Sequence, residues 1–119
     1  MSQSLFERLG GVAGITKIAS DLIDNDVANK LTAPRFANID IPKLKNSAAT
    51  FIISGTGGPN VYKGKDVLSA HKGMNISPAE FMAILDHALA ALTKNNIGQR
   101  EQEEFLFILY SMRSQVVLV

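Results

Sequence analysis

Residues 55–73 read GTGGPNVYKGKDVLSAHKG. The first part of this stretch, up to Lys65, is rich in glycine and turn-forming residues, which do not support a regular helix or strand. A loop of this length is long for a chain of 119 residues, and long loops usually cover or frame a site. The residues that follow, roughly 66–72, are predicted to form a short helix that carries His71. The stretch therefore indicates where a functional site is expected.

Two amphipathic helices are predicted before this loop. Over residues 12–31, apolar side chains recur at spacings of three and four, which is the period of a helix with one buried face. Asp40 followed by Pro42 is typical of a helix start, so a second helix is expected from there to the glycines of the loop. Residues 32–38 lack a clear period and are predicted to form a corner that turns Phe36 inward. The apolar positions of the two helices are Ile15, Ile18, Ala19, Leu22, Ile23 and Val27, and then Leu44, Ala48, Phe51 and Ile52.

Two further helices are predicted after the loop. Residues 77–80, Ser-Pro-Ala-Glu, match a capping box with proline at the first helical position, so a helix should run from there to about Lys94. A last helix is expected after Gly98, and the apolar tail over 116–119 is expected to cap the core or a neighbour. The buried faces of these helices are Phe81, Ile84, Leu85, Ala88 and Leu92, and then Phe105, Ile108, Leu109, Met112 and Val116. No segment reads as a strand or a repeat, so the predicted fold class is all-α.

Composition limits the classes of function. With 119 residues, of which 46% are hydrophobic, the chain is expected to form one domain over residues 1–119. The 12 basic residues nearly balance the 11 acidic ones, so no nucleic-acid partner is expected. No apolar run approaches the roughly 20 residues that span a bilayer, and the start of the chain is too polar for a signal peptide, so no membrane partner is expected either. The absence of cysteine excludes disulfides and thiolate sites and fits a reducing compartment, with a cytoplasmic location as the default.

The sequence has two histidines, and each has an ordinary structural interpretation. His87 lies mid-helix beside acidic and apolar residues and is interpreted as structural. His71 has no companions at metal-ligand spacing, so it cannot make a zinc site by itself. One imidazole is enough for haem, however, because the porphyrin supplies four nitrogens and the protein needs to add only an axial ligand and an apolar slot.

Other signals of chemistry are weak. Residues 55–58 resemble a phosphate-binding loop only loosely, because the P-loop lysine and a preceding strand are missing. No serine stands in a strand-to-helix elbow, so a catalytic triad is not predicted. Acidic residues crowd the start of the last helix, where the helix dipole explains them; they are Glu101, Glu103 and Glu104.

Taken in order, four segments resemble a truncated haemoglobin of group I. They are Leu5–Gly11, Arg35–Asp40, Gly57–Gly64 and Ala70–Gly73, and the resemblance covers almost all of the chain. The double glycine of the first segment and the Gly-Gly-Pro loop before Ala-His are its most specific parts. The resemblance implies a shortened globin fold, a sandwich of two helices over two, and haem b (iron protoporphyrin IX) as the cofactor.

The resemblance also assigns residues to the haem. It implies that His71 binds the iron, that Phe36 wedges against the porphyrin and that Tyr62 faces a propionate. One of three lysines, Lys45, Lys63 or Lys65, is expected to pair with a propionate, and the sequence does not choose among them. The positions that line the haem slot in the family are occupied here by Leu44, Phe51, Ile76, Phe81 and Ile84.

The distal side of the predicted pocket departs from the family. Relatives usually present a tyrosine and one or two glutamines to the bound gas, whereas Ile23, Leu44 and Ala48 stand at those places here. Ser47 stands where some relatives carry a histidine or lysine that closes on the iron, and its side chain is too short to do so. We therefore expect five-coordinate iron in an apolar distal pocket.

The expected function is reversible binding of diatomic gases, O2, CO or NO, including oxygen binding and transport. A pocket without hydrogen-bond donors predicts weaker oxygen binding and relatively strong binding of CO or NO. Efficient peroxidase activity is not expected, because no distal acid or base is assigned. Two alternatives stay open at this point, an NO-detoxifying haem protein with a dioxygenase-type activity and a haem-free interaction module that has kept the fold. The expected partners are a gas ligand and, as a candidate, a reductase, and the chain is expected to be a monomer or a weak homodimer.

Overall fold

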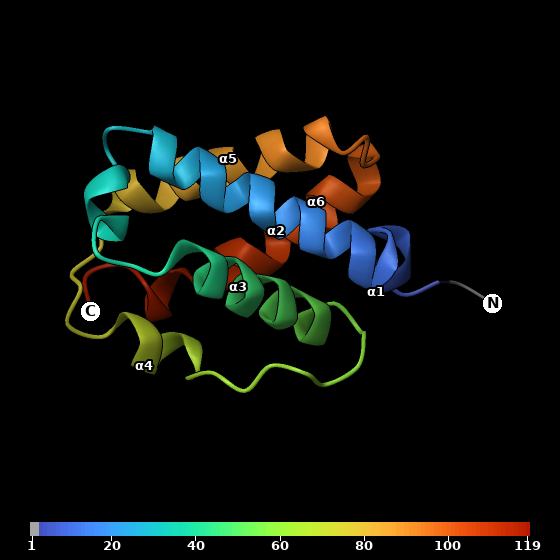
Figure 1. Cartoon of the computed structure of the whole chain (residues 1–119), viewed down its shortest axis with the longest axis horizontal. Helices are drawn as coiled ribbons and strands as arrows, with labels where there is room; N and C mark the ends of the chain where they lie inside the picture. The colour runs from blue at the N-terminus through green and yellow to red at the C-terminus, as the bar shows by residue number, and fades with distance from the viewer. Residues whose placement is uncertain (1–2) are drawn as a thin grey trace.

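Six α-helices and two short 3-10 helices make up the computed structural model over residues 3–119, the part of the chain that it describes. The long helices form two pairs: α2 (Gly11–Ala28) packs on α3 (Ile41–Gly55), and α5 (Pro78–Lys94) packs on α6 (Gln99–Ser111). In Figure 1, α2 crosses α5 and packs on α3 below it, while α4 (Val67–His71) lies beyond α3 at the end of the long loop. Within the described residues there is no β-strand, and the all-α prediction is confirmed.

The first helix among the described residues is the short α1 (Leu5–Arg8), which the periodicity did not predict. Ser4 and Glu7 form a capping box at its start. The two residues have the spacing of that motif in the sequence, so it could have predicted this helix. The helix α2 follows and ends at Ala28, three residues before the predicted end at Leu31. It ends there because the side-chain oxygen of Asn29 accepts a hydrogen bond from the backbone N–H of Leu31 at 2.9 Å, which makes a local turn.

The predicted corner is present as a 3-10 helix, η1 (Ala33–Phe36). The helix α3 then starts where the sequence predicts, because the carboxylate of Asp40 accepts a hydrogen bond from the backbone N–H of Lys43 at 3.1 Å. The corner leads the chain from α2 to α3 and so places Phe36 and its neighbour Arg35 beside the space between the helices.

Side chains hold the long loop against α3. The hydroxyl of Ser54 accepts hydrogen bonds from the backbone N–H groups of Val61 and Tyr62, each at 3.0 Å. The ring of Tyr62 packs edge-on against Phe51, with ring centroids 5.1 Å apart. Asp66 then caps α4 by accepting a hydrogen bond from the backbone N–H of Ser69 at 2.8 Å. The irregular loop and the short helix are therefore both confirmed.

The end of the chain differs from the prediction. The last helix, α6, stops at Ser111 and is followed by the 3-10 turn η2 (Arg113–Gln115), so the prediction that it continues through Val116 was wrong. The tail instead runs beside the segment after α4, where the backbone N–H of Leu118 donates to the carbonyl of Ile76 at 2.9 Å. Val117 is buried there. The apolar tail thus caps the core of its own chain.

The acids at the start of α6 have a partner that the sequence analysis missed. The guanidinium of Arg8 in α1 donates to Glu101 at 3.1 Å and to Glu104 at 2.9 Å, which ties the first helix to the last. The helix dipole therefore explains only in part why acidic residues gather at the start of α6. None of the described helices is long and apolar enough to cross a membrane.

Candidate functional site

A cavity of about 490 Å³ lies among α2, α3, α4, α5 and α6. Most of the side chains that line it are aliphatic or aromatic, and its volume lies in the range of small-molecule and cofactor sites. An apolar space of this size is unusual inside a small domain, because protein interiors are close-packed. The cavity is therefore the candidate functional site.

His71 is the last residue of α4 and lines this cavity. Its ring nitrogen Nδ1 lies 2.8 Å from the backbone carbonyl of Val67, one turn earlier in the same helix. A carbonyl can only accept, so Nδ1 carries a hydrogen, and in a neutral imidazole the lone pair is then on the other nitrogen, Nε2. An imidazole held in this way can act as a ligand to a metal through Nε2.

The structure brings nearly all of the sequence-predicted site residues to one cavity. The lining includes His71 and the following predicted residues: Ile23, Phe36, Leu44, Ser47, Ala48, Phe51, Tyr62, Ile76, Phe81 and Ile84. They come from α2, the corner, α3, the long loop, α4, the segment before α5 and α5 itself, so residues distant in sequence meet here. Of the predicted site residues, Lys45 lies outside the lining, as does Lys63, one of the other candidate lysines.

The three candidate lysines are in different surroundings. The ammonium group of Lys45 lies 2.7 Å from a carboxylate oxygen of Asp24 on α2. Lys65 lines the cavity, and Lys63 does not. The hydroxyl of Tyr62 donates to the backbone carbonyl of Lys65 at 2.6 Å, which fixes the loop at the rim. Of the three lysines, only Lys65 is thus placed beside the cavity.

Four polar side chains in the cavity wall were missed by the sequence analysis: Asp26, Thr32, Arg35 and Glu80. Each of them has a polar partner within the fold. Asp26 follows Ile23 by three residues on α2, so helical spacing could have placed it on the same face. The other three carried no local signal, because their role depends on contacts between distant segments.

Asp26 and His87 form a buried pair between α2 and α5. The carboxylate oxygen Oδ1 of Asp26 lies 2.7 Å from Nδ1 of His87, whose Nε2 lies 3.0 Å from the side-chain nitrogen of Asn29. Asp26 is only 3% exposed, and burial raises the pKa of its carboxyl to about 6. Both ring nitrogens of His87 are thereby occupied, which agrees with its interpretation as a structural histidine.

This pair predicts a particular pH dependence of stability. The pKa of the Asp26 carboxyl is 3.8 in its ordinary state and about 6 in the folded chain, so the folded state binds the proton more tightly. The free energy of unfolding should therefore fall as the pH rises from about 4 to about 6 and then level off, by up to about 3 kcal/mol from this group. Asp26→Asn should flatten that fall in urea unfolding experiments at a series of pH values.

Asp24→Asn is the matched control for this experiment, because Asp24 lies on the same helix with its side chain 60% exposed. The control should keep the wild-type dependence between pH 4 and 6. An Asp26→Asn variant whose stability still falls like that of the wild type would contradict the assignment of this dependence to Asp26.

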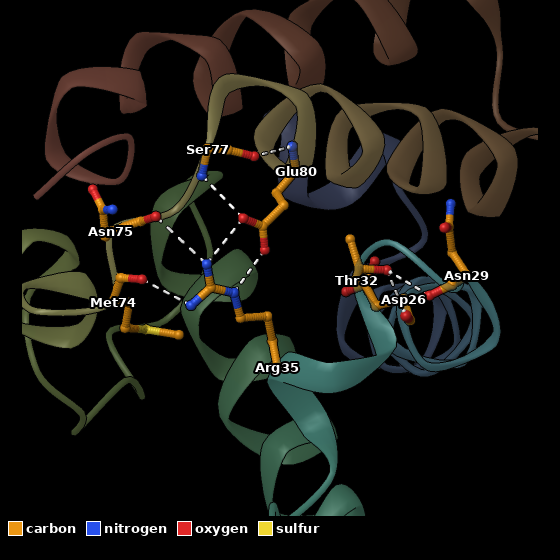
Figure 2. A network of polar contacts seen from close by, with 8 residues as sticks. All are labelled: Asp26, Asn29, Thr32, Arg35, Met74, Asn75, Ser77 and Glu80. Atoms are coloured by element: carbon orange, nitrogen blue, oxygen red, sulfur yellow. Dashed lines mark hydrogen bonds and ion pairs between the residues drawn. The ribbon is translucent and has the colours of Figure 1, made fainter.

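A second polar network closes one edge of the cavity (Figure 2). The guanidinium of Arg35 makes a two-pronged contact with Glu80, through Nε at 2.6 Å and Nη2 at 2.9 Å. Glu80 also accepts a hydrogen bond from the backbone N–H of Ser77 at 3.1 Å, which completes the capping box of α5. These contacts with Arg35 lower the pKa of the Glu80 carboxyl to about 2, so the pair is charged at neutral pH.

The described residues contain no cluster of three or more His, Cys, Asp or Glu side chains that could hold a metal ion. A metal at His71 would therefore need most of its ligands from another molecule. A porphyrin, which brings four nitrogens, meets that requirement. The single oriented imidazole and the apolar walls fit such a group.

Comparison with known proteins agrees with this picture. The model of the family described as Bacterial-like globin matches residues 4–117. A group 1 truncated haemoglobin of Tetrahymena pyriformis is 32% identical over 90 residues, which cover 76% of this chain and 74% of the relative. One from Tetrahymena thermophila is 30% identical over 97 residues, covering 82% of this chain and 80% of the relative.

Solved structures show the same fold. The truncated haemoglobin of Tetrahymena pyriformis in its Fe(III) form superposes with a TM-score of 0.94 at 26% identity, over 98% of this chain and 100% of that one. The 2/2 haemoglobin of Synechococcus sp. PCC 7002, solved in the cyanomet state with covalently attached haem, gives a TM-score of 0.90 at 24% identity, over 97% and 98% of the two chains. The prediction of a sandwich of two helices over two is confirmed.

Proposed function

Because the chain belongs to the bacterial-like globin family and, within it, to the group 1 truncated haemoglobins, we propose that it binds one haem b in this cavity through His71 and reversibly binds diatomic gases there. The observation that carries the proposal is the orientation of His71, whose Nδ1 is held by the carbonyl of Val67 while its ring lines an apolar cavity. When bound, the haem supplies the iron at which the gas binds. The protein supplies the axial nitrogen, the orientation of the ring system and a space lined mostly by apolar side chains.

The walls of the cavity suit a flat apolar molecule. Phe36 reaches the cavity from the corner and Phe81 from α5, and aliphatic side chains of α2, α3 and α5 line the walls between them. Burial of a large apolar ring against such side chains contributes about 25 cal/mol per Å² of surface removed from water. The apolar lining thus supplies affinity for the cofactor, and His71 fixes its position.

We assign the propionate contact to Lys65 in preference to Lys45 and Lys63. Lys65 is exposed at the rim of the cavity, where an acid group of the cofactor would meet solvent. Lys45 already has a carboxylate partner in Asp24. Since the Tyr62 hydroxyl donates its hydrogen to the loop carbonyl of Lys65, Tyr62 acts at this rim by holding Lys65 in place and by packing on Phe51.

The distal side offers few hydrogen-bond donors. Ile23, Leu44 and Ala48 line the cavity without any polar atom in their side chains. The hydroxyl of Thr32 also lies in the wall, but it donates to the backbone carbonyl of Asp26 at 2.6 Å. Oxygen gains more than CO from a nearby donor, so we propose weak oxygen binding and relatively strong binding of CO or NO.

A sixth ligand from the protein is disfavoured. Ser47 is exposed at the rim, and its side chain is short. His87 is held between Asp26 and Asn29 and does not line the cavity. We therefore propose five-coordinate iron in the absence of a gas.

Titration of haem into the haem-free protein tests the proposal. The absorbance change should saturate at one haem per chain, and the complex should survive gel filtration. A protein that is folded by circular dichroism but shows no saturable binding would make the haem-free interaction module the better account of its function.

A further inference from the structure

Backbone hydrogen bonds hold the turn that follows His71, up to Ile76, whose side chain is buried. None of the five residues of α4, all of them described, is fully buried; Val67 and His71 are half-buried where they line the cavity. The chain turns directly after it, with Gly73 and Asn75 both at positive φ (89° and 50°). The position of His71 therefore depends on what holds the two ends of this short helix.

The C-terminal tail holds one side of this segment. The backbone N–H groups of Gly73 and Asn75 both donate to the carbonyl of Val119, at 3.1 and 2.9 Å. One position further on, the carbonyl of Ile76 accepts a hydrogen bond from Leu118 at 2.9 Å. The tail thus satisfies the donors of the turn but leaves the carbonyls of Met74 and Asn75 to other partners.

Arg35 is the partner of those carbonyls (Figure 2). Its Nη1 donates to the carbonyl of Met74 at 2.7 Å, and its Nη2 lies 3.5 Å from that of Asn75. The same guanidinium holds Glu80 at the start of α5, so one side chain joins the corner, the turn after His71 and α5. A lysine could not do this, because its single ammonium lacks the planar fork that serves several acceptors at once.

We propose that Arg35 is a positioning residue for the proximal ligand: by holding the carbonyls of Met74 and Asn75, it fixes where α4 presents His71 to the haem. This inference rests on the proposed function, because it concerns the same histidine. Arg35 directly precedes Phe36, whose side chain lines the cavity. Arg35 therefore links Phe36 to the turn that follows His71. Arg35 itself does not bind the iron.

The test compares Arg35→Met and Arg35→Lys with a matched control, Arg8→Met. Arg8 makes the same kind of contact with Glu101 and Glu104 between α1 and α6, and it does not line the cavity. In the haem-free chain, Arg35→Met should speed hydrogen exchange at the amides of Gly73 and Asn75, roughly tenfold. Arg8→Met should leave those amides unchanged even where it lowers overall stability.

The haem-loaded protein supplies the second measurement. Arg35→Met should release haem to a scavenger protein roughly ten times faster and should shift or broaden the iron–histidine stretching band of the ferrous protein, since residues that orient a ligand typically affect metal affinity about 10–100-fold. Arg35→Lys should lie between wild type and Arg35→Met, and Arg8→Met should match wild type in both readouts.

Two outcomes would overturn the inference. The first is unchanged exchange at Gly73 and Asn75 in Arg35→Met, which would show that the tail alone holds the turn. The second is a wild-type haem release rate and stretching band in Arg35→Met, which would leave Arg35 a purely structural role. A wild-type protein that fails to bind haem is a different result, which contradicts the proposed function itself.

Discussion

Replacement of His71 by glycine is expected to raise the rate of haem loss by a hundredfold or more, because the variant loses the only protein atom assigned to the iron. Residues that merely orient a ligand account for about 10–100-fold in metal affinity, so removal of the ligand itself should cost at least as much. Free imidazole should enter the space left by the side chain and restore a ferrous spectrum like that of the wild type. Haem transfer to a scavenger protein, followed by absorbance with and without imidazole, measures both effects.

His87→Asn is the control for this substitution. It removes the other histidine, which bonds to Asp26 and Asn29 and does not line the cavity. The His87→Asn variant should be less stable, because the buried contact with Asp26 is weakened. It should nevertheless retain haem with an unchanged ferrous spectrum. If His71→Gly kept its haem without imidazole while His87→Asn lost it, His87 and not His71 would be the axial ligand.

Ile23→Tyr is expected to slow the dissociation of oxygen by roughly ten- to a hundredfold, which corresponds to a hydrogen bond of about 1.5–3 kcal/mol. Ile23 lines the cavity from α2 and is only 6% exposed, so a phenol at this position would point its hydroxyl into an apolar space. Release of CO should change much less, since CO gains little from a donor. Stopped-flow displacement of each gas gives the two rates directly.

Ile23→Phe separates the hydroxyl from the added volume. It places a ring of nearly the same size in the cavity without a donor, so it should leave oxygen dissociation close to the wild-type rate. Equal slowing by tyrosine and phenylalanine would mean that the larger side chain simply obstructs escape of the gas, and the account of a donor-poor distal pocket would then be wrong.

The helices were predictable wherever the signal was local. Asp40 and Ser77 mark the starts of α3 and α5 in the sequence as they do in the structure, because a capping residue acts within one turn of itself. The end of α6 was not predictable in this way. Val117 is not helical and packs beside Ile76, which is distant in the sequence. No residue near Val117 in the sequence indicates that contact.

In the candidate site, too, residues with a local signal were predictable and residues held by distant contacts were not. The apolar lining residues could be placed from the sequence through helical spacing and through the family resemblance. The polar residues of the wall could not, because Arg35 has its partner 45 positions away in Glu80, and Asp26 has its partner 61 positions away in His87. The choice among the three lysines also needed the fold, since it depends on the contact between Lys45 and Asp24 across two helices.

That His71 is the single protein ligand of a gas-binding haem is tested most directly by the absorption spectrum of the ferrous, haem-loaded wild-type protein before and after addition of CO. We predict the broad bands of a five-coordinate ferrous haem before CO and a complete shift to the sharp bands of a CO complex afterwards. A ferrous spectrum that is already six-coordinate before CO, or one that CO does not shift, would contradict the proposal that the distal side is open and that His71 binds alone.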